Sequence, residues 1–517
     1  MFITLSFLTT IWNIVVFLIV LGLVICIHEL GHFFFARKAG ILCHEFSFGM
    51  GPRLYSKKFG ETLFSIRAIP FGGFVSMAGE DLETEVIKIG KKIRLGFDSS
   101  NEVNRIIVNA ANPNYHDYLE VKVDDFDLSS EAGSRLFINE YTVKRNAMYV
   151  MDKQTIQIAP KDRNFVNKTK WQRFITTFGG PLMNFLLAIV VFFIISLSIG
   201  VPDGQSTVIG EVSDNMPASD VIVVGDEIIK INGVDITSWD GETNSVSSEL
   251  GKTYDSYIIE VERDGEIIEL VSVSPQLIFY GLGFTSTMNS DDLVIGSPLY
   301  ISSELLSGDE IVSIDGIIMN SWEDVVDFAN GYTAGSTEEN PTEIVILRDG
   351  TEHTFTYVAY GTDVLDAMGF ESFYSRIGIT GSTKFSFFGS FGGAWNSFVS
   401  AGSTIFKTIG LMFSSNQVGV SDLSGFVGIF TMTSQAAAGG IISLLSWVGL
   451  LSVNLGIVNL LPIPALDGGR IVFIGYEAIT RRKPNQKVEN WLHTIMFFLL
   501  MGLLIFITYN DILRLFK

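Results

Sequence analysis

The amino-acid sequence predicts a multi-pass α-helical membrane protein with four transmembrane helices, a membrane re-entrant β-segment and two extramembrane β-rich domains. Three observations predict this fold class: four long uncharged apolar runs, a strand-like stretch between the first two runs, and an internal repeat between the second and the third. Hydrophobic residues make up 47% of the chain and the mean hydropathy is +0.36. The chain is therefore too apolar for an ordinary soluble enzyme and too polar for a pure transporter bundle.

The four uncharged runs cover residues 1–27, 174–201, 423–466 and 494–510. A helix of roughly 20 apolar residues crosses a bilayer, so each of the first three runs is long enough. The fourth is shorter and needs Trp491, His493 and Tyr509 as interfacial flanks. The first run lacks a basic start and a small-residue cleavage site, so it is expected to be a retained span and not a secretory signal.

The charged residues predict the orientation of these spans. Cytoplasmic loops favour lysine and arginine, and three connections are rich in them, which places these three connections on the cytoplasmic side. Residues 201–380 hold about five lysine or arginine residues against more than thirty acidic ones, so this block is expected outside, together with both termini. Its acidity also argues against a nucleic-acid partner. The basic residues are Arg37, Lys38, Arg53, Lys57 and Lys58, then Lys168, Lys170 and Arg173, then Arg470, Arg481, Arg482, Lys483 and Lys487.

Two β-rich stretches lie between the first two runs. Residues 61–77 carry strand-like residues interrupted by Pro70 and the Gly72-Gly73 pair, which indicates a short sheet with a tight turn. Because this stretch is apolar and lies between two spans, we expect it to enter the membrane region. Irregular or sheet backbone at that depth requires protein cover or a wet cavity, so a cavity is implied. The polar residues that follow, up to 167, predict a small β-rich cytoplasmic insertion.

An internal repeat occupies the acidic block. Residues 225–239 read GDEIIKINGVDITSW and residues 308–322 read GDEIVSIDGIIMNSW, and an Arg-Asp-Gly hairpin signal follows each copy. The pattern predicts two tandem β-rich modules and resembles PDZ domains, which bind extended peptides by adding a strand. Peptide ligands or gating are therefore possible functions, and the alternative is a pair of spacers. Further on, the Phe-, Gly- and Ser-rich residues 384–415 predict an amphipathic helix on the outer surface.

These observations divide the chain into nine segments. They are 1–43, the first transmembrane helix; 44–80, the re-entrant β-segment; 81–168, the cytoplasmic insertion; 169–202, the second transmembrane helix; 203–277 and 278–362, the two PDZ-like domains; 363–422, a linker with the amphipathic helix; 423–470, the third transmembrane helix; and 471–517, a cytoplasmic loop with the fourth.

Residues 28–32 read His-Glu-Leu-Gly-His, an H-E-x-x-H pattern. On a helix, residues four apart share a face, so His28 and His32 can hold one zinc ion while Glu29 acts beside them as a base. The pattern ends the first apolar run, and ionisable residues in a membrane helix indicate function by default. The alternative is a polar cluster that merely ends the span.

A catalytic zinc site takes a third protein ligand and leaves one position open. Asp467 is the first acid after the third uncharged run, and the charge pattern places it on the same side as His28 and His32. Pro462 and Pro464 break the helix before it, and the following glycine pair permits close backbone approach. Taken alone, Asp467 could be a simple helix-end acid; together with the two histidines it is predicted to be a zinc ligand.

These motifs resemble those of the site-2 protease family, above all its bacterial members. The likeness covers most of the chain and is carried by HELGH, by the N-x-x-P-x-P-x-L-D-G pattern from Asn459 to Gly468, and by three shorter motifs. Residue 426 departs from the family pattern, because phenylalanine stands where the family usually has proline. The shorter motifs are FGMGP at 48–52, FGGFV at 71–75 and GPLMN at 180–184.

The resemblance implies a zinc-dependent intramembrane endopeptidase in the bacterial plasma membrane. His28, His32 and Asp467 would hold Zn2+, Glu29 would be the general base, and Asn459 would lie near the substrate backbone. The segment that contains Gly72 and Gly73 would offer a strand edge to the substrate. Expected partners are the lipid bilayer and single-span membrane proteins, such as anti-sigma factors or signal-peptide remnants. Two alternatives are a catalytically inactive membrane scaffold that presents PDZ modules, and an ordinary zinc protease acting on soluble peptides at the membrane surface.

Overall fold

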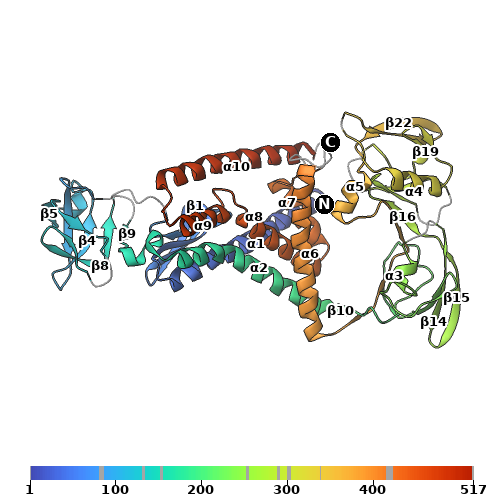
Figure 1. Cartoon of the computed structure of the whole chain (residues 1–517), viewed down its shortest axis with the longest axis horizontal. Helices are drawn as coiled ribbons and strands as arrows, with labels where there is room; N and C mark the ends of the chain where they lie inside the picture. The colour runs from blue at the N-terminus through green and yellow to red at the C-terminus, as the bar shows by residue number, and fades with distance from the viewer. Residues whose placement is uncertain are drawn as a thin grey trace. The chain divides into compact units, whose positions relative to one another are not determined.

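The computed structural model describes residues 2–80, 87–130, 134–151, 155–251, 255–287, 292–299, 304–337, 339–414 and 423–514 (Figure 1). Its contacts define two compact units, one formed by Met1–Val191 with Gly428–Ile505 and the other by Phe192–Val427 with Phe506–Lys517. In the part of the chain that the structure describes, four helices are long and apolar enough to cross a membrane, as the sequence predicts. These segments are Leu8–Lys38 in α1 (Phe2–Lys38), α2 (Lys170–Ile199), α8 (Ile441–Leu460) and Lys487–Leu513 in α10 (Gln486–Arg514).

In the first unit, α1, α2 and α8 pack closely wherever a glycine or a small polar residue removes side-chain bulk. A Cβ atom at Gly31 would lie 2.0 Å from the carbonyl oxygen of Gly179, so the two backbones nearly touch. A Cβ atom at Gly456 would lie 2.4 Å from the ring of Phe185, and the Ser452 hydroxyl donates to the carbonyl of Asn184 at 2.8 Å. Small residues and interhelical hydrogen bonds are the usual means of joining helices in lipid.

The third uncharged run differs from the prediction of one long span over 423–470. The structure divides it into α7 (Phe426–Ala438) and α8, with a break at Gly439 and Gly440. The φ angle of Gly440 is +91°, a conformation that glycine adopts readily because it has no Cβ atom. After α8 the chain forms a proline-containing loop, and α9 (Asp467–Thr480) begins at Asp467 itself. The N-x-x-P-x-P-x-L-D-G pattern therefore covers a helix end, a loop and a helix start. α7 begins normally despite the phenylalanine at 426, and the Gly425 N–H donates to the Asp511 carboxylate at 2.8 Å.

The predicted re-entrant segment is a compact sheet made by β1 (Cys43–Phe59) and β2 (Thr62–Met77). Both strands fold back on themselves, so that residues 43–48 lie between residues 62–66 on one side and residues 73–77 on the other. The turn predicted near Gly72 is present, with φ +100° at that glycine, and a second turn lies at residues 60–61. Residues 73–77 consequently form an edge of this sheet.

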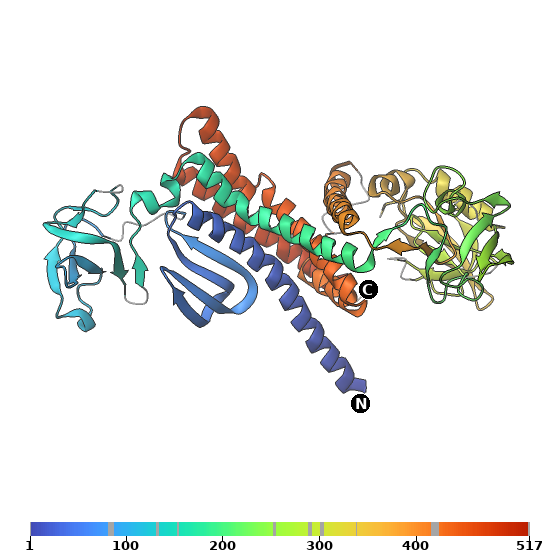
Figure 2. The same cartoon turned by 90° about the horizontal axis from the view of Figure 1, so that it is seen from below.

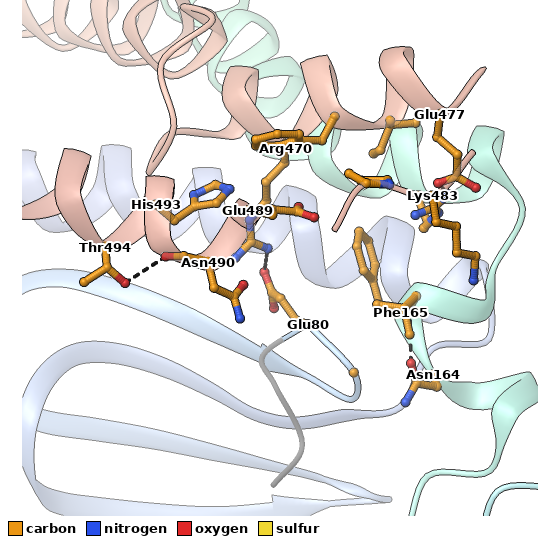
Figure 3. Close-up of a pocket in the computed structure, with 16 residues that line it drawn as sticks. Glu80, Asn164, Phe165, Arg470, Glu477, Lys483, Glu489, Asn490, His493 and Thr494 are labelled. Atoms are coloured by element: carbon orange, nitrogen blue, oxygen red, sulfur yellow. Dashed lines mark hydrogen bonds and ion pairs between the residues drawn. The ribbon is translucent and has the colours of Figure 1, made fainter. Parts of the chain in front are cut away.

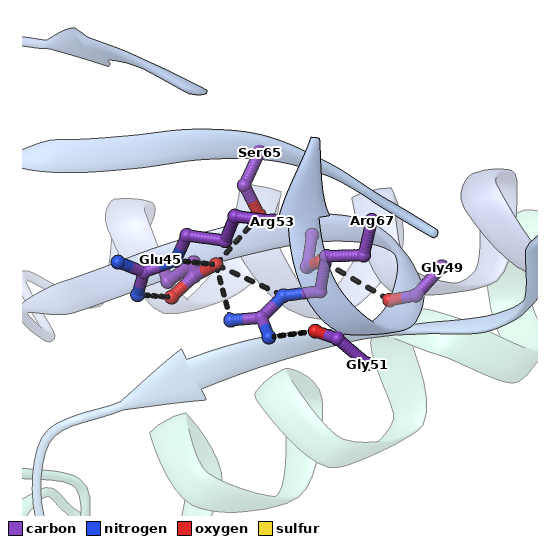
Figure 4. A network of polar contacts seen from close by, with 7 residues as sticks. Glu45, Gly49, Gly51, Arg53, Ser65 and Arg67 are labelled. Carbon is purple, nitrogen blue, oxygen red and sulfur yellow. Dashed lines mark hydrogen bonds and ion pairs between the residues drawn. The ribbon is translucent and has the colours of Figure 1, made fainter. Parts of the chain in front are cut away.

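A buried carboxylate organises the sheet from inside (Figure 4). Glu45 is 7% exposed and accepts hydrogen bonds from Arg53, from Arg67 at 2.8 Å and from Ser65 at 2.5 Å. Arg67 also donates to the carbonyl of Gly51 at 2.6 Å. The Glu45 carboxylate balances one of the two arginine charges, and the Gly51 carbonyl accepts a further hydrogen bond from Arg67, which reduces the cost of holding these groups among apolar residues.

The insertion is a seven-stranded sheet with its own apolar core, as expected for a β-rich segment. The order is β5-β3-β4-β8-β7-β6, and β9 pairs with β8. Near its end, Arg163 pairs with Glu61 at 2.7 Å and so ties the insertion to the turn of the β1–β2 sheet. The strands are β3 (Lys92–Phe97), β4 (Val103–Ile107), β5 (Leu119–Lys122), β6 (Phe126–Asp127), β7 (Leu136–Ile138), β8 (Tyr141–Val150) and β9 (Thr155–Gln157).

In the second unit, the sequence repeat corresponds to two matching four-stranded sheets, ordered β13-β12-β14-β15 and β20-β19-β21-β22. In each copy an aspartate of the repeated motif pairs with the arginine of the Arg-Asp-Gly turn, Asp226 with Arg263 and Asp309 with Arg348, both at 2.7 Å. The elements are β12 (Glu227–Ile231), β13 (Val234–Asp235), α3 (Val246–Glu249), β14 (Tyr257–Arg263) and β15 (Glu266–Val273), then β19 (Glu310–Ile314), β20 (Ile317–Ile318), α4 (Trp322–Gly331), β21 (Thr342–Arg348) and β22 (Thr351–Tyr357).

In its described part the expected linker over 363–422 is largely structured, and its orange helices are visible in Figure 2. The pairing of residues 379–381 with residues 209–212 shows that the two modules are nested and not tandem. After α5 (Thr362–Met368), β23 (Tyr374–Arg376) extends the sheet β18-β17-β16-β23, and β24 (Ile379–Gly381) pairs with β11 (Ile209–Val212). Ile377 belongs to the core of the first module. The remaining strands of that sheet are β16 (Gln276–Phe279), β17 (Phe284–Ser286) and β18 (Ile295–Pro298).

A two-stranded stem holds both ends of the nested modules together. β10 (Val201–Pro202), directly after α2, pairs with β25 (Thr383–Lys384), and Lys384 pairs with Asp203 at 2.9 Å. The expected amphipathic helix follows as α6 (Phe387–Ser414). Residues 415–422, the end of the predicted linker, lie outside the described residues.

Replacing Asp309 by alanine should destabilise the second module by roughly 1–3 kcal/mol, because its buried carboxylate holds a partly exposed arginine. Burial alone would raise the pKa of Asp309, but the hydrogen bonds from Arg348 lower it overall. The stabilisation is therefore complete above about pH 4 and is lost as the pH falls further. Hydrogen exchange of residues 310–357, measured against pH, tests this. Glu352→Ala on the exposed face of β22 is the control, and equal protection in both variants would contradict the prediction.

Candidate metal centre and active site

The end of α1 presents two imidazoles to one point. His28 and His32 lie one helical turn apart, are 6% and 8% exposed, and have their Nε2 atoms 3.2 Å apart. Glu29 follows His28 and lines the same cavity. The helical spacing therefore produces the shared face that the H-E-x-x-H pattern predicts.

Asp467 reaches these histidines from α9, far away in the sequence. Its Oδ2 lies 3.1 Å from Nε2 of His28 and 3.3 Å from Nε2 of His32. Gly468 and Gly469 permit this approach, because a Cβ atom at either would lie 2.1–2.5 Å from a carbonyl oxygen of residues 461–463. The structure thus brings together the three predicted zinc ligands, whose ligand atoms all lie within 4.8 Å of one another.

The donor set fits a tetrahedral zinc ion. Zinc bonds of 2.0–2.2 Å to nitrogen and oxygen separate neighbouring ligand atoms by roughly 3.3 Å, close to the three distances found here. Gly180 on α2 keeps space open beside them, because a Cβ atom there would lie 2.4 Å from Nε2 of His32 and 2.7 Å from Nε2 of His28. Two imidazoles and one carboxylate are a ligand set typical of catalytic zinc.

Residues of α2 orient both imidazoles by contacting their Nδ1 atoms, on the opposite side of each ring from the shared point. Nδ1 of His32 lies 2.9 Å from the carbonyl oxygen of Thr176, an acceptor that directs the Nε2 lone pair toward the shared point. Nδ1 of His28 lies 3.3 Å from the amide nitrogen of Asn184, whose Oδ1 is buried without a hydrogen-bond partner among the described residues. A half-turn of this amide would let Oδ1 accept from Nδ1 and satisfy both groups.

A cavity of about 270 Å³ adjoins the three ligand atoms and includes part of the sheet edge. Phe74, Val75 and Met77 line it, as does Asn459 from α8. A Cβ atom at Gly73 would lie 3.2 Å from Cγ of Glu29, so a glycine there lets the sheet approach the catalytic helix. The structure therefore brings Asn459 and Gly73 to the candidate site. Gly72 instead forms the turn and lies against Met50.

Two charged residues of this cavity were not singled out from the sequence. Arg470 and Glu80 form an ion pair, and both also line a second, larger cavity of about 660 Å³ near the start of α10 (Figure 3). Arg470 could have been suspected from its position three residues after Asp467, on the next turn of one helix. Glu80 gives no sequence signal, because its role arises only from the fold of the β1–β2 sheet.

A family model supplies the deciding comparison. The model described as peptidase family M50 matches residues 16–503. The chain belongs to peptidase family M50. Full-length relatives agree with this. The regulator of sigma-W protease RasP of Bacillus subtilis (strain 168) is 32% identical over 98% of this chain and 99% of its own length. A putative zinc metalloprotease of Staphylococcus aureus (strain N315) is 33% identical with the same coverage.

The membership confirms the prediction of a zinc metalloprotease of the site-2 protease type within a multi-pass membrane protein. A further relative, the zinc metalloprotease RasP of Bacillus licheniformis, is 32% identical over 98% of this chain and 99% of its own length. The M50 match starts in α1 and ends in α10, and it therefore includes both the histidine pair and Asp467.

Gly180→Ala should reduce zinc binding at least tenfold, because the new methyl group would occupy the space beside both Nε2 atoms. Zinc content of the purified protein measures this directly. Gly502→Ala in α10 is the matched control, since nothing lies within 4 Å of the Cβ position there. Full zinc occupancy in the Gly180 variant would contradict the requirement for open space beside the two Nε2 atoms.

Proposed function

We propose that the chain is a zinc-dependent endopeptidase that hydrolyses peptide bonds in or near transmembrane segments of membrane proteins. The observation that carries this is the convergence of His28, His32 and Asp467 at the end of a span, beside Glu29 and a sheet edge. Family membership supports the class of reaction, and the place of the cluster supports the class of substrate. A catalytically inactive scaffold would not need four such groups at one point.

In this proposal His28, His32 and Asp467 hold the zinc ion, oriented through Thr176 and Asn184. When bound, zinc supplies Lewis acidity and lowers the pKa of a water molecule toward neutrality. The Glu29 carboxylate would accept a proton from the water molecule that attacks the scissile carbonyl, and would then deliver this proton to the leaving amine. The Asn459 amide lines the same cavity and would hold the substrate backbone by hydrogen bonding.

The sheet edge at residues 73–77 would hold the unwound substrate. A helical substrate has its carbonyl groups in internal hydrogen bonds, so the scissile region must first become extended. Among the described residues, the strand at 73–77 pairs with residues 43–48 on one side only, and Phe74, Val75 and Met77 line the cavity beside Glu29. Addition of a substrate strand at this edge would present its carbonyl groups to the metal centre.

We further propose that the β1–β2 sheet enters the membrane. Its outer turn exposes large apolar side chains, and Lys57 and Lys58 accompany them at one end, as in segments that contact lipid headgroups. The exposed apolar residues are Met50, Leu54, Tyr55, Phe59, Ile66 and Ile69. The lysine- and arginine-rich connections support a cytoplasmic location for this side in a bacterial cell, with the acidic modules outside.

The PDZ-like modules would restrict access from outside. They are joined to the membrane helices through the β10–β25 stem, and extended peptides that add a strand are the class of ligand they would take. Because both ends meet at the stem, the pair can act as one body that excludes substrates with a bulky outer domain.

Glu29→Gln should reduce cleavage of a reconstituted single-span substrate by about 10²–10⁴-fold, because the amide cannot accept the proton. Zinc content should stay at the wild-type level, since Glu29 is not among the three ligands. The matched control is Glu352→Gln, the same change on an exposed strand. Unchanged cleavage in the Glu29 variant would contradict the proposed function.

Replacing residues 207–381 with a short glycine linker tests the gating role. Ser206 and Ser382 lie within a 3.2 Å hydrogen bond of each other, so the linker can close the gap. We expect the variant to cleave a substrate with its outer domain intact, which the wild type leaves uncut. Cleavage of the trimmed substrate is the control for folding. If the untrimmed substrate remains uncut, the modules do not exclude it.

A further inference from the structure

The loop that delivers Asp467 contains an unusual backbone conformation at Ala465. Its φ is +84°, a region that residues with a Cβ atom rarely adopt. Among the described residues, the other non-glycine residues with positive φ are asparagines, aspartates and Arg481, with φ between 48° and 59°. Ala465 is the one with an aliphatic side chain, and no local side-chain hydrogen bond can stabilise its conformation.

A side chain from the fourth span holds this strained residue. The Ala465 N–H donates to Nδ1 of His493 on α10 at 2.8 Å. Pro462 and Pro464 have no N–H to donate, and the N–H groups of Ile463 and Leu466 donate to carbonyl groups within the loop. Among the described hydrogen bonds of residues 462–466, the bond from the Ala465 N–H is therefore the backbone N–H bond that connects the loop to another helix.

The His493 ring also contacts α9. Its centroid lies 5.8 Å from that of Phe473 on α9, and the ring borders the larger cavity (Figure 3). α9 begins with Asp467, so His493 contacts both the loop before this aspartate and the helix after it. Strained conformations persist only where surrounding contacts determine them, and they occur mainly at functional sites.

We infer that His493 is a positioning residue that holds Asp467 in register with His28 and His32 by accepting the Ala465 N–H. This inference rests on the proposed function of Asp467 as a zinc ligand. Loss of the acceptor would let residue 465 leave its positive-φ conformation, and the Asp467 carboxylate, two residues further on, would move away from the two Nε2 atoms. A displacement of about 1 Å is enough to impair a catalytic arrangement.

Two substitutions at 493 separate this role from simple packing. His493→Asn keeps an acceptor at the δ position, whereas His493→Gln places its polar atoms one bond further out. We expect His493→Gln to release zinc to a chelator about two- to tenfold faster than the wild type, with a similar fall in kcat and little change in KM. His493→Asn should stay within about twofold of the wild type. Thr494→Val is the matched control, because Thr494 borders the same cavity and donates only within its own helix.

Ala465→Gly supplies a second, independent measurement. Glycine adopts positive φ without strain, so it should retain zinc and should reduce the effect of His493→Gln in the double variant. Equal zinc release by the Asn and Gln variants, or an undiminished Gln effect in the glycine background, would overturn the inference. Asp467→Asn distinguishes failure of the proposed function from failure of the proposed role of His493. If that variant keeps zinc and activity, the proposed function fails; if it loses both while His493→Gln matches the wild type, only the role of His493 fails.

Discussion

The candidate site depends on the close approach of α1 and α2 at Gly31, Gly179 and Gly180. Polar groups at the end of a membrane helix need partners within the protein, because lipid offers none. With the two backbones nearly in contact, Thr176 and Asn184 reach the far side of both imidazoles, and the space beside Gly180 stays open for a metal ion. A methyl group at any of the three glycines would separate these elements, so the ligand geometry follows from helix packing as much as from the ligands themselves.

Two further elements converge on this helix pair, and each brings one requirement of the proposed reaction. The β1–β2 sheet lies against α1 through Gly73 and supplies a strand edge beside Glu29. The loop before α9 supplies Asp467, and the Ala465 N–H of this loop donates a hydrogen bond to His493 of the fourth span. The Arg470–Glu80 ion pair connects the two, since one partner belongs to α9 and the other follows the sheet. The proposed substrate-binding edge and the proposed metal site therefore share structural supports, and a substitution that weakens binding at one is expected to weaken binding at the other.

The second unit shows how a sequence repeat can conceal its connectivity. Two similar modules in sequence order suggest a tandem pair, but the chain returns after the second module, where Ile377 enters the core of the first module and β24 pairs with β11. Antiparallel pairing places no limit on the sequence separation of its partners, so the return could not be read from local patterns. The nesting brings the entry and exit of the pair to one stem, which lets both modules act as a single body in the proposed gating.

The sequence by itself determined the four apolar runs, the H-E-x-x-H pair and the β-rich character of the extramembrane segments, because each depends on local composition or short spacing. It also indicated Asp467 as a candidate metal ligand, because the charge pattern of the loops assigns the end of the third run to the same side as the histidines. Only the tertiary structure decided the break between α7 and α8, the nesting of the modules, the edge position of residues 73–77 and the parts played by Gly180, Glu80 and His493. These features arise from contacts between residues far apart in the chain. His493 illustrates the difference: in the sequence it is one polar residue beside an apolar run, and its hydrogen bond to Ala465 exists only because α10 packs beside the loop that ends in Asp467.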